Sequence, residues 1–146
     1  MKKIQDIVDG KPLIFVGPRE KVRNVAKRMA AQRIGAVPVI DDGKLVGIFT
    51  ERDLMTRAVA RNLDLDTLEI SAVMTREIAV ASPLETVDEC LERMMGLGCR
   101  HLPVVDRGAL VGIVSLRDLL QVENQQRGAT VSFLRELVTY KPEYES

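Results

Sequence analysis

The sequence predicts a mixed α/β fold of the α+β kind. Two tandem β-α-β-β-α repeats, related by a pseudo-twofold axis, are expected to form two small sheets packed against helices. The first observation is an internal repeat: residues 18–54 align with residues 83–119 without a gap, at an offset of 65, and 16 of the 37 positions are identical. The second is the apolar spacing, which changes from helical to strand-like within each copy. The third is size, because one three-stranded sheet with two helices cannot bury a sufficient core alone. We therefore expect the two copies to pack sheet against sheet.

Each copy begins with a short apolar run, LIFV at 13–16 and IAVA at 78–81, which predicts a first strand. The segment SPLE follows the second run and has the form of a capping box, with Ser82 as N-cap and Pro83 at the first helical position. GPRE at 17–20 has the same form, with glycine as the cap. We therefore expect the first helix of each copy to begin at its proline.

The first helix of each copy carries one apolar stripe at the spacing i, i+3, i+4, i+7, i+8. The stripe predicts that its methionines and Cys90 are core residues. Its members are Val22, Val25, Ala26, Met29 and Ala30 in the first copy and Val87, Cys90, Leu91, Met94 and Met95 in the second.

Two further strands follow in each copy, joined by the turns DDGK and DRGA, whose Asp and Gly residues favour hairpins. The motif GIFTERD then places Thr50 three residues before Asp53, and GIVSLRD repeats the arrangement with Ser115 and Asp118. Both have the form of a capping box with Asp in place of Glu, which predicts the start of a second helix.

The predicted organisation is a first repeat at 1–61, a linker with a short helix at 62–75, a second repeat at 76–125 and a helical tail at 126–146. The tail helix is expected to end at Pro142 and to present an apolar face that needs a cover. That face consists of Val131, Leu134, Leu137 and Val138.

Composition narrows the function. The 21 basic residues balance the 21 acidic residues, so a nucleic-acid binder that relies on phosphate contacts is disfavoured. No apolar run is long enough for a membrane span, and the N-terminus lacks an apolar signal region, so we expect a cytoplasmic protein. One histidine and two isolated cysteines give no catalytic triad and no zinc set, and no Walker-type phosphate loop is present. We therefore do not expect an enzyme, a metal site or an obligatory cofactor.

The duplicated helix, the segments GAVPVID and RHLPVVD, and the motifs GIFTERD and GIVSLRD closely resemble the CBS domain. The resemblance covers residues 1–125, and the chain looks like a stand-alone CBS-domain pair, or Bateman module. It implies a regulatory protein that binds an adenine nucleotide (AMP, ADP or ATP) in clefts between the repeats, with the hydroxyl and aspartate of each motif holding the ligand. It also implies a homodimer and a target protein that the sequence does not name.

The resemblance places one half of each cleft in the motif of one repeat and the other half in the opposite repeat. Cleft one is expected to combine Ile48, Thr50, Arg52 and Asp53 with Ala79, Cys99, Arg100 and His101. Cleft two is expected to combine Ile113, Ser115, Arg117 and Asp118 with Pro12, Ile14, Ile34, Gly35 and Ala36.

The clefts differ in expected charge. Arg52, Arg100 and His101 surround the expected phosphate position of cleft one, whereas cleft two is expected to offer only Arg117. The hypothesis is that cleft one prefers a charged nucleotide and that cleft two takes a less charged adenosyl ligand or stays empty. Two alternatives are open: a structural interaction or dimerisation module without ligand, and a binder of S-adenosylmethionine or NAD.

Overall fold

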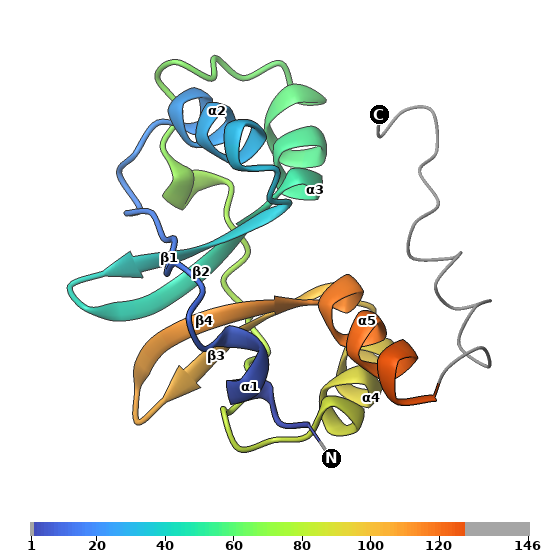
Figure 1. The fold of residues 1–146 in the computed structure, drawn as a ribbon. Coiled ribbons are helices and arrows are strands. Elements are labelled where there is room, and N and C mark those ends of the chain that lie inside the picture. Colours follow the sequence, from blue (N-terminus) through green and yellow to red (C-terminus); the bar gives the residue numbers. More distant parts are fainter. Residues whose placement is uncertain (1, 128–146) are drawn as a thin grey trace.

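The computed structural model describes residues 2–127, and it has the predicted fold class: two copies of a helix, a hairpin and a second helix (Figure 1). The first copy contains α2 (Val22–Gln32), β1 (Ala36–Asp41), β2 (Lys44–Thr50) and α3 (Glu51–Asp53), which continues as the π-helical turn Leu54–Val59. The second contains α4 (Val87–Leu97), β3 (His101–Asp106), β4 (Ala109–Ser115) and α5 (Leu116–Arg127). A short helix precedes each copy: α1 (Ile4–Val8) and the 3-10 turn Ile70–Ala72, the latter inside the predicted linker. The predicted tail helix with Val131, Leu134, Leu137 and Val138 lies outside the described residues.

The two hairpins confirm the turns expected from the sequence. Asp42 and Gly43 have φ values of 51° and 76°, and Arg107 and Gly108 have φ values of 52° and 81°. Positive φ at both central residues is the signature of the type I′ turn, whose twist matches that of the flanking strands. Each hairpin also has a register shift at the equivalent place. The duplicated sequence therefore folds into duplicated local structure.

The predicted first strands at 13–16 and 78–81 are wrong. Only their last residues pair: Val16 forms a single parallel bridge with Val39, and Ala81 forms one with Val104. Each sheet therefore has two strands, β1-β2 or β3-β4. The reason is that residues 9–15 cross from one repeat to the other, so they do not run along a sheet.

The first helices also begin later than predicted. Helix α4 begins at Val87 with Thr86 as its cap, whose side chain accepts the Glu89 N–H. Residues 82–85 form a turn instead, in which the Ser82 N–H donates to Glu85 Oε1 at 2.8 Å and the Glu85 N–H donates to the Ser82 carbonyl at 3.1 Å. The residues of the capping-box sequence thus bond to one another in a separate turn that precedes the helix. Helix α2 also begins after an equivalent turn, at Val22, but its N-cap residue Lys21 forms no side-chain cap hydrogen bond.

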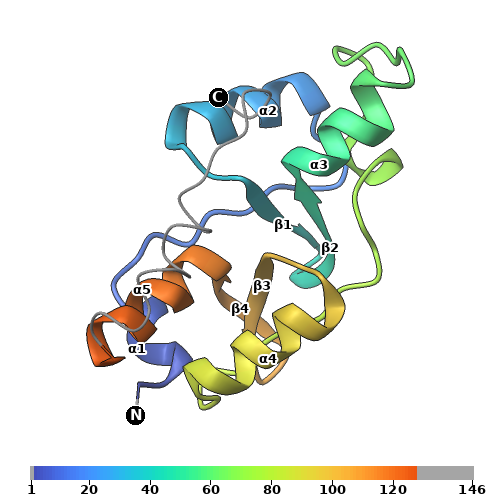
Figure 2. The ribbon, with the colours of Figure 1, turned by 90° about the vertical axis from the view of Figure 1, so that its right-hand side faces the viewer.

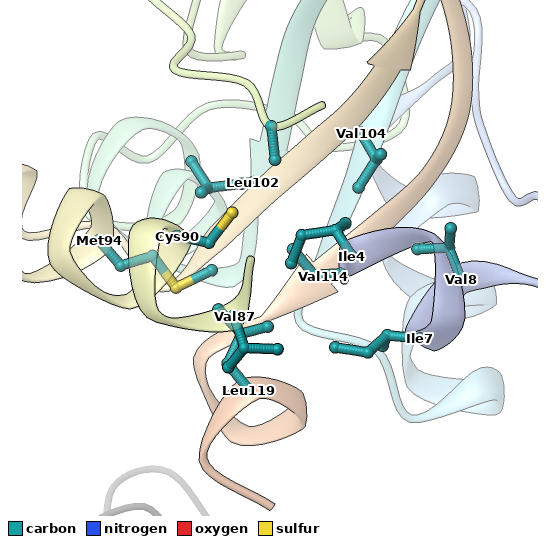
Figure 3. Packing of buried hydrophobic residues seen from close by; sticks show 11 residues of the cluster. Ile4, Ile7, Val8, Val87, Cys90, Met94, Leu102, Val104, Val114 and Leu119 are labelled. Atoms are coloured by element: carbon teal, nitrogen blue, oxygen red, sulfur yellow. The ribbon is translucent and has the colours of Figure 1, made fainter. Parts of the chain in front are cut away.

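The core is divided into two clusters, and each cluster takes residues from the segment that precedes the other repeat. Ile4, Ile7 and Val8 of α1 pack with the strands and helices of the second repeat, as Figure 3 shows around Val114 and Leu119. In the same way, the residues before the second repeat pack with the first repeat, namely Ile70, Val73 and Met74. The chain therefore crosses between the repeats twice, at residues 9–15 and 75–80.

Candidate functional site

A cavity of about 810 Å³ lies between the two repeats, a size suited to a small-molecule ligand. Its walls come from the first crossing segment, the end of α2, the start of β1, and the junction of β4 with α5. Figure 2 shows α2 above β1 and α5 beside β4. The lining includes the aliphatic side chains Val8, Leu13, Ile14, Met29, Ile34, Ile113 and Leu116.

The second copy of the motif provides a carboxylate at the cavity wall. Ser115 caps helix α5: its hydroxyl accepts the Asp118 N–H at 3.1 Å, and its own N–H donates to Asp118 Oδ2 at 3.0 Å. The Asp118 side chain remains 30% exposed, and its Oδ1 lies 4.0 Å from the Lys11 ammonium nitrogen. The reciprocal cap fixes the carboxylate in place while one oxygen faces the first crossing segment.

The cavity lining has more positive than negative charge. Its basic side chains are Lys11, Arg33, Arg100 and Arg117, and its acidic side chains are Glu51 and Asp118. Guanidinium and ammonium groups bind phosphate oxygens, whereas a carboxylate accepts hydrogen bonds from hydroxyl groups. The lining therefore suits a ligand that has both hydroxyl and anionic groups.

His101, the first residue of β3, lies among these charges. Burial lowers its pKa below the ordinary value of 6.5; Asp118 acts in the opposite direction and Arg100 in the same direction. The imidazole is therefore mostly neutral at pH 7. A methyl group built on Gly35 would lie 3.7 Å from the His101 ring and 2.9 Å from the Glu51 carboxylate, so both side chains lie close to the Gly35 backbone.

The structure brings together every residue that was expected in cleft two. These are Pro12, Ile14, Ile34, Gly35, Ala36, Ile113, Ser115, Arg117 and Asp118. It also places Arg100 and His101 in this lining, although the sequence assigned them to cleft one. The expectation that cleft two offers only Arg117 is therefore wrong, because β3 begins between the repeats and its first residues face this cavity.

The other cleft-one residues lie in a more closed environment. Ile48 and Asp53 are buried, Thr50 is half-buried and Arg52 is exposed. Ala79 and Cys99 are partly buried against the core of the second repeat. Whether these residues contact a ligand stays a prediction.

Three charged cavity residues were missed from the sequence: Lys11, Arg33 and Glu51. Arg33 ends helix α2 with a left-handed φ of 57°, and Glu51 is the first residue of α3. Glu51 lies inside GIFTERD, between Thr50 and Arg52, but it was not expected in either cleft. Lys11 gave no signal, because its place depends on the crossing of residues 9–15.

Three further findings on residues 2–127 concern metal ions, thiol chemistry and membrane spans. No group of three or more His, Cys, Asp or Glu side chains in that range could hold a metal ion. Burial raises the pKa of the Cys90 thiol to about 11, so it is not a nucleophile at neutral pH. Within the same range, no helix is long and apolar enough to cross a membrane.

Comparison with known proteins gives one consistent answer. The family model of the CBS domain matches residues 4–60 and 70–124. The chain is 34% identical to the CBS domain-containing protein YhcV of Bacillus subtilis, over 80% of this chain and 84% of the relative. It is similar to the solved structure of the CBS-domain containing protein ATU1752 from Agrobacterium tumefaciens, with a TM-score of 0.77, 34% identity, and coverage of 84% of this chain and 99% of the other.

A further solved structure includes ligands. The CBS domain pair of protein MJ0100, in complex with 5′-methylthioadenosine and S-adenosyl-L-methionine, matches with a TM-score of 0.77 and 30% identity, over 86% of this chain and 98% of the other. The duplicated fold, the motif positions and these similarities agree, and the chain belongs to the CBS domain family, with two CBS repeats.

Proposed function

We propose that the chain is a regulatory module that binds an anionic adenosine ligand, such as AMP, ADP or ATP, in the cavity between its repeats. One observation carries this proposal: a single cavity combines the capped carboxylate of Asp118 with four basic side chains. The CBS pair of MJ0100, which holds two adenosine derivatives, supports the choice of the adenosyl group.

The cavity residues suggest a role for each part of the ligand. Asp118 can accept hydrogen bonds from both ribose hydroxyls, and Ser115 can complete that site. Arg100, Arg117 and Lys11 are the candidates for phosphate contacts. The adenine ring would lie between aliphatic side chains such as Ile14 and Ile113, since aromatic residues make up only 3% of the sequence.

Charge separates the candidate ligands. Four basic and two acidic groups line the cavity, so Coulomb energy favours a phosphate over the sulfonium cation of S-adenosylmethionine. NAD is anionic and fits the charge equally well. Charge therefore ranks S-adenosylmethionine last and leaves NAD as an alternative to AMP, ADP and ATP.

Regulation follows from the position of the cavity between the repeats. A ligand there contacts both halves, and it shifts their arrangement only if it binds one arrangement more tightly. We propose that such a shift is read by a partner protein in the cytoplasm, and that the chain has no catalytic activity of its own.

Isothermal titration with AMP, ATP, NAD and S-adenosylmethionine tests the proposal. Asp118→Asn retains a cap acceptor but removes the carboxylate charge, so AMP affinity should fall at least about tenfold. Asp106→Asn is the matched control: it removes one negative charge from the same repeat, at an exposed position outside the cavity, and should leave affinity unchanged. Absence of heat and of any thermal shift with all four compounds would favour the structural alternative.

We also propose a homodimer formed through the helical faces. Met55, Val59, Met95 and Leu97 are large apolar side chains on helical segments, and all are more than half exposed. The prediction that Met95 is a core residue is therefore wrong, because this end of the α4 stripe faces away from the sheet. Helix α2 has three basic residues and no acidic residue, whereas α4 has three acidic residues and one basic residue. This complementarity favours pairing of α2 in one copy with α4 in the other.

Light scattering at micromolar concentration tests the dimer. Met95→Glu should yield a monomer, whereas Leu84→Glu, at an exposed apolar residue in the turn before α4, should leave the dimer intact. A wild-type monomer would contradict this part of the proposal without affecting ligand binding.

A further inference from the structure

The two copies of the motif have different surroundings, although their sequences are alike. The Asp118 side chain is 30% exposed and lines the cavity, whereas the Asp53 side chain is only 6% exposed. The preceding isoleucines differ in the same way, since Ile113 lines the cavity and Ile48 is buried. Something covers the first motif that does not cover the second.

The cover is the second crossing segment, which begins at Thr75. The Thr75 hydroxyl contacts both oxygens of the Asp53 carboxylate, at 3.0 and 3.2 Å. Its backbone pairs with Ile48 through two hydrogen bonds of 2.8 and 2.9 Å. Thr75 therefore occupies both the carboxylate and the strand edge of the first motif.

Arg57, in the π-helical turn, also contacts both Asp53 and the residue before Thr75. Its Nε lies 3.6 Å from Asp53 Oδ1, and its Nη1 donates to the Met74 carbonyl at 3.0 Å. One guanidinium thus joins the carboxylate of the motif to the backbone of the crossing segment. Together with the Thr50 N–H at 3.1 Å from Oδ2, these groups give both oxygens of the Asp53 carboxylate a partner within the first repeat and the crossing segment.

The second repeat lacks both groups. Val122 stands 65 residues after Arg57 and cannot form an ion pair. Thr75 comes shortly after the 3-10 turn Ile70–Ala72, and the equivalent place after α1 holds Asp9 and Gly10. Neither of these residues has a hydroxyl group. Among the isolated bridges of residues 2–127, Ile48 pairs with Thr75 and none involves Ile113.

We propose that the two motifs have separate tasks: GIVSLRD binds the ligand, and GIFTERD, through Asp53, Thr75 and Arg57, is a latch that fastens the crossing segment and closes the first cleft. The protein then binds one ligand per chain. The stoichiometry rests on the proposed function, whereas the latch is a property of the ligand-free protein.

Titration of AMP measures the stoichiometry. The wild type should bind one AMP per chain; Asp118→Asn should weaken this binding at least about tenfold, and Asp53→Asn should change it less than about twofold. In the double variant Arg57→Val and Thr75→Ala, valine replaces the arginine, as Val122 does in the second repeat, and the Thr75 hydroxyl is absent. The latch should then open, and binding of a second AMP should appear. Two wild-type sites, or equal losses from the two aspartate variants, would overturn the proposal while leaving nucleotide binding established.

Hydrogen exchange of the ligand-free protein tests the latch independently. The amides of Ile48 and Thr75 should exchange slowly in the wild type and at least about tenfold faster in the double variant, because local opening sets the exchange rate. Fast exchange of both amides in the wild type would overturn the latch even if AMP binds. If AMP does not bind but the protection is present, the proposed function fails and the latch stands. Circular dichroism shows whether the double variant is still folded. If it is unfolded, the single variant Thr75→Val, which keeps the side-chain volume but lacks the hydroxyl, is measured in its place.

Discussion

Arg93 of helix α4 donates hydrogen bonds from both terminal guanidinium nitrogens to the carboxylate of Glu85, and its Nη1 lies 3.1 Å from Oε1. The same Nη1 donates to the Val80 carbonyl at 2.8 Å. Burial raises the pKa of Glu85, but the hydrogen bonds from Arg93 and from the Ser82 N–H outweigh it, so the pKa lies below the ordinary value of 4.5. This pair ties α4 to the turn and the crossing segment that precede it.

Glu85→Gln should therefore destabilise the protein by about 1.5 to 3 kcal/mol at pH 7, the range for a hydrogen bond to a charged group. A carboxyl group with a lowered folded pKa stabilises fully above its unfolded pKa and loses that contribution as pH falls through the folded value. The difference between wild type and variant should therefore shrink below about pH 4.5. Urea unfolding at pH 7 and pH 3.5 measures it, and the exposed Glu92→Gln on the same helix is the control.

The motif glycine Gly112 is predicted to be intolerant of a methyl group. A Cβ atom there would lie 2.9 Å from both Cβ and Cγ1 of Val8, which belongs to the buried face of α1. Gly112→Ala should cost about 1 to 3 kcal/mol through overpacking. Gly96→Ala in helix α4 has no heavy atom within 4 Å of the added methyl and should instead stabilise by about 0.5 to 1 kcal/mol. Thermal or urea unfolding that ranks these variants in the opposite order would contradict the close packing of α1 on β4.

Phe49 anchors the core of the first repeat. Its side chain is fully buried, so Phe49→Ala should cost about 3 to 5 kcal/mol through lost burial and a residual cavity. Phe15 is 50% exposed in the first crossing segment, and Phe15→Ala should cost much less. Urea titrations of the two variants compare their free energies of unfolding, and both variants lose the same side-chain volume. Similar midpoints would show that Phe49 is not part of a tightly packed core.

His101 should make nucleotide affinity depend on pH. Its lowered pKa leaves it neutral in the empty cavity, and a phosphate near Arg100 and His101 would raise that pKa, so binding should be accompanied by proton uptake. AMP affinity should therefore rise as pH falls from 7.5 to 6.5. Calorimetry in two buffers of different ionisation enthalpy measures the uptake. The phosphate of AMP also titrates in this range, and the His101→Gln variant measures that contribution alone. If this variant takes up as many protons as the wild type, the histidine has no role in the pH dependence.

The same neutral His101 has the opposite effect on the ligand-free fold. A group that is harder to protonate in the folded state destabilises that state as pH falls below the unfolded pKa, near 6.5. Stability of the ligand-free wild type should therefore decline from pH 7 toward lower pH, and His101→Gln should remove that part of the decline. Glu51, Asp118 and Arg100 also face this ring, so the comparison with the variant isolates the histidine from these neighbours.

Local patterns in the sequence predicted local structure well. The hairpins followed from Asp and Gly at turn positions, and the caps at Thr50 and Ser115 followed from the aspartate three residues later. These hairpins and caps depend on interactions within a few residues. The nine residues that the family resemblance assigned to cleft two all line one cavity.

Features that depend on the crossing segments were not predictable in this way. Residues 13–16 have an apolar pattern typical of a strand, yet Leu13 and Phe15 are exposed because the segment passes between the repeats. The late start of α4 depends on Glu85 bonding to Ser82 and Arg93 instead of continuing a helix. The difference between Asp53 and Asp118 arises from Thr75 and Arg57, which lie outside the motif that the repeats share.

The packing of α1 against β4 has a consequence for how such a protein could arise. A single repeat together with its own leading helix cannot complete its core, because the helix reaches only the opposite repeat. Two separate single-repeat chains could satisfy both cores by exchanging these helices, as domain-swapped dimers do. Joining the two genes end to end would then turn an exchange between molecules into one within a chain. Each half would then be free to change alone, and one aspartate could gain partners that the other lacks.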